Sequence, residues 1–125
     1  MKPTIELKLP VNPEFVALLR HVSGAAAVRS DLTVNLLDDS KIACSEAAIL
    51  LINNAIENSD FTWAWYCHDK QLDVQASVPT LLQEVPDFGS MEGFTWTVLS
   101  AVAKSLGVTL IEGNLVITFS ITESG

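Results

Sequence analysis

The stretch at residues 38–55 constrains the fold most, because it reads as a long helix that is apolar around most of its circumference. On a helical wheel, four polar residues align along one side: Asp39, Glu46, Asn53 and Glu57. The opposite side is apolar and consists of Leu37, Cys44, Ala48, Leu51 and Ala55. Such a helix is typical of a domain interior, where carboxylates and amides are costly unless neighbours satisfy them. We therefore predict a central helix that Thr33 caps, that is buried over residues 38–56 and that ends near residue 58. Its polar side lines a cleft or pairs with neighbouring groups.

The rest of the chain alternates between strand and helix patterns around this helix. Strict alternation predicts a strand at residues 4–9, at an edge of the sheet, and strands at 61–68, 72–78, 108–111 and 115–121. Turns at Asp69-Lys70 and Gly113-Asn114 join the last four strands into two hairpins. An Asn12 cap followed by Pro13 begins a helix that closes at Arg29, and Ser90 begins another that ends at Gly107. The resulting order, βααββαββ, favours a two-layer α+β sandwich in which three helices cover one face of a mixed, mostly antiparallel sheet. We predict that residues 1–125 form a single domain.

Composition narrows the classes of partner. The chain has a formal net charge of −8, which argues against binding to nucleic acid or an anionic membrane and suits a basic protein partner. No apolar signal region or membrane-length run is present in the sequence, so we expect a cytoplasmic protein. Cys44 and Cys67 have no metal-type spacing and are interpreted as buried thiols. The three tryptophans, interpreted as core residues, are Trp63, Trp65 and Trp96.

Two segments resemble a known family. Leu32-Thr33 followed by the DDSKIACSEA run at residues 38–47 is similar to the L-S/T…D-D-L-K-I-A-V-S-E-A segment of bacterial anti-sigma regulatory factors. The NPEFV run at residues 12–16, with Arg20, resembles that family's P-E-Y/F-V…R segment. These factors are small serine/threonine kinases with the histidine-kinase-like (GHKL) ATPase fold. The resemblance therefore implies the same fold that the order of elements favours.

The resemblance also locates a nucleotide site on the central helix. In the family, this helix supplies a Glu that acts as general base and, one turn later, an Asn that coordinates Mg²⁺. Glu46 matches the Glu, but Leu50 stands at the Asn position. Asn53 lies near Glu46 on the helical wheel, and Asn54 occupies a position that is often His or polar in the family. Glu46 is thus the catalytic candidate only if the protein is active.

The two remaining nucleotide motifs of the family depart further. The D-x-G-x-G motif that recognises adenine is replaced at residues 77–81 by SVPTL, which holds no acid and no glycine. In the glycine-rich lid only Gly93 remains, while Glu92 would repel phosphate and Trp96 adds bulk. The cofactor-binding candidates are therefore vestigial and matter only if ATP binds: Asn53, Asn54 and Gly93. We assign no metal ligand and expect no cofactor; the alternative is ATP with Mg²⁺.

Three functions follow from these observations. The first is a regulatory protein-binding module that acts by partner switching, is not an enzyme, and binds a sigma factor or an anti-anti-sigma (STAS-type) protein. Many members of the family form homodimers, so the resemblance also implies a dimer. The alternative is an active ATP-dependent serine/threonine kinase of an anti-anti-sigma protein, in which Glu46 activates the substrate hydroxyl. A third possibility is a sensor of a small ligand, which would bind in the cleft that holds the nucleotide in the resembling family.

Overall fold

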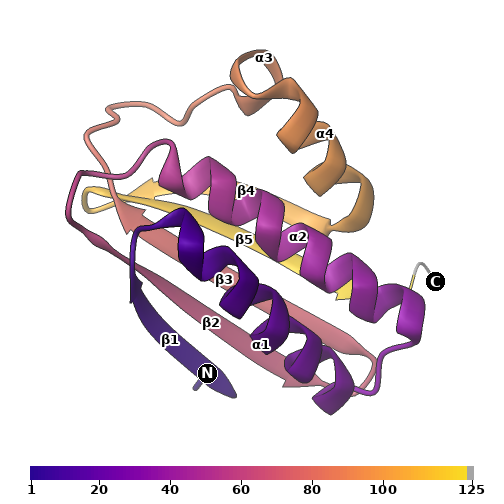
Figure 1. Cartoon of the computed structure of the whole chain (residues 1–125). Helices are drawn as coiled ribbons and strands as arrows, with labels where there is room; N and C mark the ends of the chain where they lie inside the picture. The colour runs from indigo at the N-terminus through magenta and orange to yellow at the C-terminus, as the bar shows by residue number, and fades with distance from the viewer. Residues whose placement is uncertain (124–125) are drawn as a thin grey trace.

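A computed structural model describes residues 1–123 as a five-stranded sheet with helices on one face (Figure 1). The strands are β1 (Ile5–Pro10), β2 (Asp60–His68), β3 (Gln71–Pro79), β4 (Lys104–Ile111) and β5 (Asn114–Thr122). The helices are the 3-10 turn η1 (Pro13–Phe15), α1 (Val16–Arg29), α2 (Val34–Ile52), α3 (Phe88–Met91) and α4 (Gly93–Val102). The predicted α+β sandwich and its order are confirmed, with the single turn α3 added before α4.

The sheet differs from the prediction in one respect. Its order is β1-β2-β3-β5-β4, and each of its four pairings is antiparallel. We predicted a mixed sheet, but the strands of residues 1–123 include no parallel pair. Two hairpins account for the pairings of β2 with β3 and of β4 with β5, and β1 lies at the edge as its clean alternation indicated.

Helix α2 lies at the centre of the helical layer, against both α1 and α4 (Figure 1). Its start is set locally, because the Thr33 Oγ1 accepts a hydrogen bond of 3.3 Å from the Leu36 amide. Its buried side holds Ser40, Ala43, Cys44, Ala47, Ala48, Leu50 and Leu51. The predicted burial of this helix is therefore confirmed.

The predicted end of this helix was wrong, because α2 stops at Ile52. The Asn54 side chain donates to the Leu50 carbonyl over 2.8 Å and so satisfies an acceptor in the last turn. The Ile56 amide then donates to the Pro79 carbonyl of β3 over 2.9 Å, which draws the chain toward the sheet. Glu57 consequently lies beyond the helix and does not extend its polar side.

The third predicted helix was also too long. Helix α4 covers Gly93–Val102, and β4 already begins at Lys104. The irregular register between Lys104 and Gly107, with Ser105 at a φ of 51°, allows the chain to enter the sheet without a longer loop. Gly107 pairs with Thr118 in the sheet and does not end a helix.

The core fills the space between the sheet and the helices. Phe61, Trp63 and Trp65 project from β2 into this core. The ring centroids of Phe61 and Trp63 are 5.8 Å apart, and those of Trp63 and Trp65 are 5.9 Å apart. Trp63, Trp65 and Cys44 are fully buried, as predicted, whereas Trp96 and Cys67 are only partly buried. Within residues 1–123 no helix combines the length and apolarity that crossing a bilayer requires.

Candidate functional site

The end of α2 packs against the α3–α4 segment, and three of the four residues proposed for a nucleotide site lie at this contact: Asn53, Asn54 and Gly93. Asn53 is the C-cap residue of α2, and Asn54 follows it in the turn. Gly93 is the first residue of α4. Glu46 lies two turns before Asn53, about 10 Å along the helix axis. The fold thus brings the two asparagines close to Gly93, whereas Glu46 lies two turns nearer the start of α2.

Glu92 joins these elements. The Asn53 Nδ2 donates to the Glu92 Oε1 over 2.6 Å, and the Asn54 Nδ2 lies 3.4 Å from the Glu92 Oε2. Glu92 is the residue immediately before Gly93, and its carbonyl accepts from the Trp96 amide over 2.9 Å as α4 begins. The carboxylate therefore accepts one hydrogen bond from each asparagine and links the start of α4 to the end of α2.

Glu46 takes no part in this network. Its side chain is half-buried, and its neighbours on the same side of α2 are Ile42 and Ile49, which are 39% and 37% exposed. A carboxylate in this position can accept a proton from an incoming hydroxyl, provided that a substrate reaches this side of the helix. Its catalytic role stays a prediction.

Leu50 occupies the position at which the resembling family has a metal-coordinating asparagine. Its side chain is fully buried in the core, so it faces away from any ligand at the end of α2. No group of three or more His, Cys, Asp and Glu side chains able to hold a metal occurs within residues 1–123. Leu50 therefore offers no oxygen ligand of the kind that Mg²⁺ takes at the position where the family has an asparagine.

The segment after β3 stands where the family recognises adenine, and here it is fixed by internal hydrogen bonds. The Thr80 Oγ1 donates to the Asn54 carbonyl over 2.7 Å, and the Thr80 amide donates to the Gly113 carbonyl over 2.9 Å. Val78 is fully buried and Leu81 is 80% exposed. The segment therefore connects α2 to the β4–β5 turn and presents no carboxylate to a base.

The remaining lid glycine is not required by the local geometry. A methyl group added at Gly93 would meet no atom within 4 Å. Beneath this segment, Phe88 is buried and its ring centroid lies 5.7 Å from that of Trp96. An aromatic contact together with the Glu92 hydrogen bonds thus holds α3 and α4 in place, where a glycine-rich lid would leave them free to close on phosphates.

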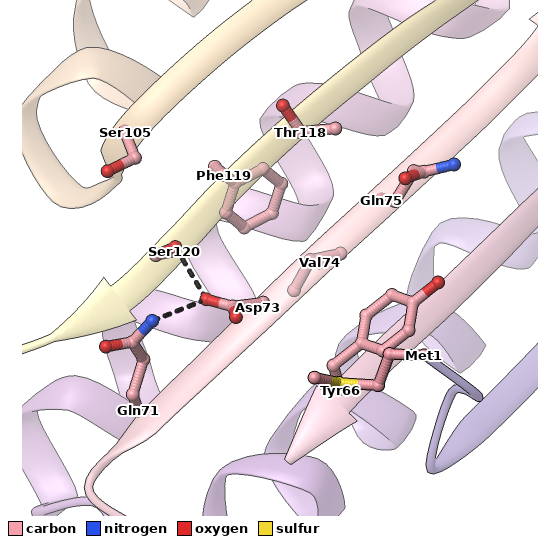
Figure 2. Close-up of a pocket in the computed structure, with 10 residues that line it drawn as sticks. All are labelled: Met1, Tyr66, Gln71, Asp73, Val74, Gln75, Ser105, Thr118, Phe119 and Ser120. Atoms are coloured by element: carbon pink, nitrogen blue, oxygen red, sulfur yellow. Dashed lines mark hydrogen bonds between the residues drawn. The ribbon is translucent and has the colours of Figure 1, made fainter. Parts of the chain in front are cut away.

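A separate hollow of about 460 Å³ lies across β2 to β5, and Figure 2 shows the side chains that line it. Asp73 is central to it: its carboxylate accepts from the Ser120 Oγ over 2.6 Å and from the Gln71 Nε2 over 2.9 Å. The His68 Nε2 lies 3.0 Å from the second carboxylate oxygen. Partial burial raises the pKa of Asp73, but these hydrogen bonds and the nearby imidazole outweigh it and hold the pKa below 3.8. The carboxylate is thus satisfied internally, and none of the predicted site residues lines this hollow.

The hydrogen-bonding roles of two acids, Glu92 and Asp73, were not predicted from the sequence. The contacts of Glu92 join residues 38 and 39 positions apart, so no local pattern announces them. Asp73 faces Tyr66 and Ser120 across the sheet, and His68 comes from the same hairpin. The predicted turn at Asp69-Lys70 sets that hairpin register and provides a signal from which the proximity of His68 and Asp73 could have been found.

Comparison with known proteins gives curated relatives but no matching family model. The chain is 31% identical over 80 residues to the serine-protein kinase RsbW of Listeria innocua, a match that covers 62% of this chain and 51% of the relative. RsbW of Listeria monocytogenes gives the same figures, and RsbW of Bacillus cereus is 28% identical over 75 residues, covering 58% and 47%. The chain spans about half the length of the curated relatives it matches. These relatives confirm the resemblance to the anti-sigma serine/threonine kinase family that residues 38–47 indicate.

Proposed function

We propose that this protein is a regulatory protein-binding module that switches between partners without binding nucleotide. Its partner is a sigma factor or an anti-anti-sigma protein of the STAS type, and it acts in the cytoplasm. It binds neither nucleic acid nor membrane, in keeping with its net charge of −8. Homodimer formation is part of the proposal, because the family resemblance implies it.

The observation that carries the proposal is the contact of Glu92 with Asn53 and Asn54. A carboxylate at this position is a negative charge where the resemblance would bring the triphosphate, and it already accepts hydrogen bonds from two of the residues assigned to the nucleotide. The buried side chain of Leu50 supports the same conclusion, because it supplies no oxygen ligand for Mg²⁺.

The alternative is an active serine/threonine kinase that uses ATP and Mg²⁺. Two observations favour it: the relatives are named serine-protein kinases, and Glu46 remains half-exposed on α2. In this mechanism Glu46 accepts the proton of the substrate hydroxyl as it attacks the terminal phosphate.

Calorimetric titration with Mg-ATP separates the two functions. The chain lacks three polar contacts, to the base, the metal and the phosphates, and each such contact contributes about 1–3 kcal/mol. Their loss amounts to roughly 3–9 kcal/mol, which is enough to abolish micromolar binding. We therefore expect any binding of Mg-ATP to be weaker than about 100 μM.

A second titration, with a purified sigma factor or STAS-type protein from the same organism, completes this test. We expect binding in the absence of nucleotide and no change when Mg-ATP is added. Binding of Mg-ATP at about 100 μM or tighter would contradict the proposal. In that case Glu46→Gln tests the kinase mechanism, because loss of a general base lowers turnover while affinity for ATP is kept.

A further inference from the structure

Helix α4 is strongly apolar, although one side of it is exposed. Its ten residues include no charged side chain, and Leu99 alone among them is buried. Phe94 is 82% exposed, and Met91 at the end of α3 is 62% exposed. Isolated exposed apolar residues are ordinary, but several neighbouring ones that include an aromatic ring commonly mark a binding surface.

The orientation of α4 explains why these side chains face outward. Leu99 points into the core and Trp96 packs against Phe88, so these two residues define the inner side of the helix. Phe94 lies about 140° around the helix from Leu99 and therefore points away from α2. Thr97 and Ala101 follow it at intervals of three and four residues, and both are exposed.

The loop before α3 carries further exposed apolar side chains, and both of its ends are anchored by hydrogen bonds. Leu81 is 80% exposed and Val85 is 51% exposed. Thr80 fixes the start of the loop to α2, and at its end the Asp87 Oδ2 accepts from the Ser90 Oγ over 2.9 Å. We use the term lid face for the exposed residues of these segments: Leu81, Val85, Met91, Phe94, Thr97 and Ala101.

Within the segments that carry the lid face the charged residues are all acidic, and the first basic residue after them is Lys104, beside Ala101 at the end of α4. These segments, residues 80–103, contain Glu84, Asp87 and Glu92 and neither Lys nor Arg. A second copy of the chain would bring these acids against one another, which is unfavourable. A partner that presents basic residues beside an apolar stripe would complement both the charge and the apolar groups.

We propose that the lid face binds a basic amphipathic helix of a partner protein. The proposal rests on the proposed function as a partner-binding module and adds the surface and the chemistry of the partner. The small side chains of Thr97 and Ala101 allow another helix to approach α4 closely. Phe94 is the aromatic anchor, and Glu84, Asp87 and Glu92 attract the basic residues that flank the partner's apolar stripe.

A fluorescence-anisotropy titration with a synthetic probe tests this surface. The probe is a labelled amphipathic peptide of about 18 residues with lysines on one side and leucines on the other. Phe94→Ala removes the anchor, and Val28→Ala on α1, where Val28 is 67% exposed, is the matched control. Neither side chain is buried, so both variants should fold. We expect Phe94→Ala to weaken binding about tenfold or more, Val28→Ala to leave it unchanged, and about 500 mM salt to weaken it for all proteins.

Three results would overturn the lid face as the site: equal binding by all three proteins, equal weakening by both variants, or no binding at low salt. Light scattering that shows a wild-type dimer and a Phe94→Ala monomer would instead assign the face to self-association and so contradict the proposal. Titration of a purified sigma factor or STAS-type protein separates the two proposals. If that regulator binds wild type and Phe94→Ala equally, the proposed function stands and the lid face fails. If only the peptide binds through Phe94, the lid face stands and the regulatory function fails.

Discussion

Removing the Glu92 carboxylate should loosen the α3–α4 segment from α2. Glu92 contributes in two ways: it accepts from the Asn53 and Asn54 side chains, and it places a negative charge at the start of α4. A hydrogen bond to a charged group contributes about 1.5–3 kcal/mol when buried. Because Asn53 is exposed to water, we expect about 1 kcal/mol from this contact. The charge at the helix N-terminus adds about 0.3–1 kcal/mol, so Glu92→Ala should cost about 1–2 kcal/mol.

This loss should appear locally before it appears in global unfolding. Helix α4 has one buried residue, Leu99, so α3 and α4 can open while α1, α2 and the sheet stay folded. Hydrogen exchange measures this opening directly, and the Met91 and Trp96 amides are suitable reporters because both bond within the segment. We expect these amides to exchange about 5–30 times faster in Glu92→Ala. Amides in the centre of β3 should be unaffected.

A double-mutant cycle separates this contact from the other effects of each substitution. It compares wild type with Glu92→Ala, Asn53→Ala and the variant that carries both. The coupling energy between Glu92 and Asn53 should be close to 1 kcal/mol. Glu84→Ala in the preceding loop removes an exposed acid and is the control, with an expected change within about 0.5 kcal/mol. A coupling energy near zero, or unchanged exchange at Met91 and Trp96, would refute the conclusion that this carboxylate holds the segment.

Two further predictions concern titratable groups away from this segment. Burial raises the pKa of the Cys44 thiol to about 12, although hydrogen bonds with Ser23 and Trp65 partly oppose it. At about pH 8 a disulfide reagent should therefore modify the half-buried Cys67 while Cys44 reacts only on unfolding, and rapid labelling of both thiols in the folded protein would contradict this. The depressed pKa of Asp73 stabilises the fold above the unfolded value near 3.8, and this contribution is lost as pH falls through the folded pKa. Denaturation curves measured from about pH 5 downward should thus show a steeper loss of stability in wild type than in Asp73→Asn, and parallel losses would contradict it.

Local residues were enough to predict most element starts and both hairpins. The Asn12 side chain accepts from the Glu14 amide at the start of η1, and Thr33 caps α2, each within three positions along the chain. The β2–β3 turn at Asp69-Lys70 likewise depends on adjacent residues, with Lys70 at a φ of 66°. Such features are readable from sequence because the groups that satisfy one another are neighbours in the chain.

The ends of α2 and α4 were not readable in this way. Helix α2 ends at Ile52, and shortly after it the Ile56 amide bonds to the carbonyl of Pro79, a residue of β3. The boundary therefore depends on the packing of this part of the chain against the sheet. The end of α4 depends on the irregular pairing of β4 with β5 near Ser105. In both places a tertiary contact outweighs the helical pattern of the sequence.

The same distinction applies to the candidate site. Sequence comparison assigned to Glu92 only a repulsion toward phosphate, because its partners on α2 are distant in the chain. The fold shows that its carboxylate, the Thr80 hydroxyl and the Leu50 side chain are each engaged by the protein itself. At Leu50 and Val78, which are both fully buried, a polar side chain would need a new buried partner. Placing polar ligand-binding groups at these positions would therefore disturb the core, so the end of α2 contributes to the cohesion of the domain whichever partner the protein binds.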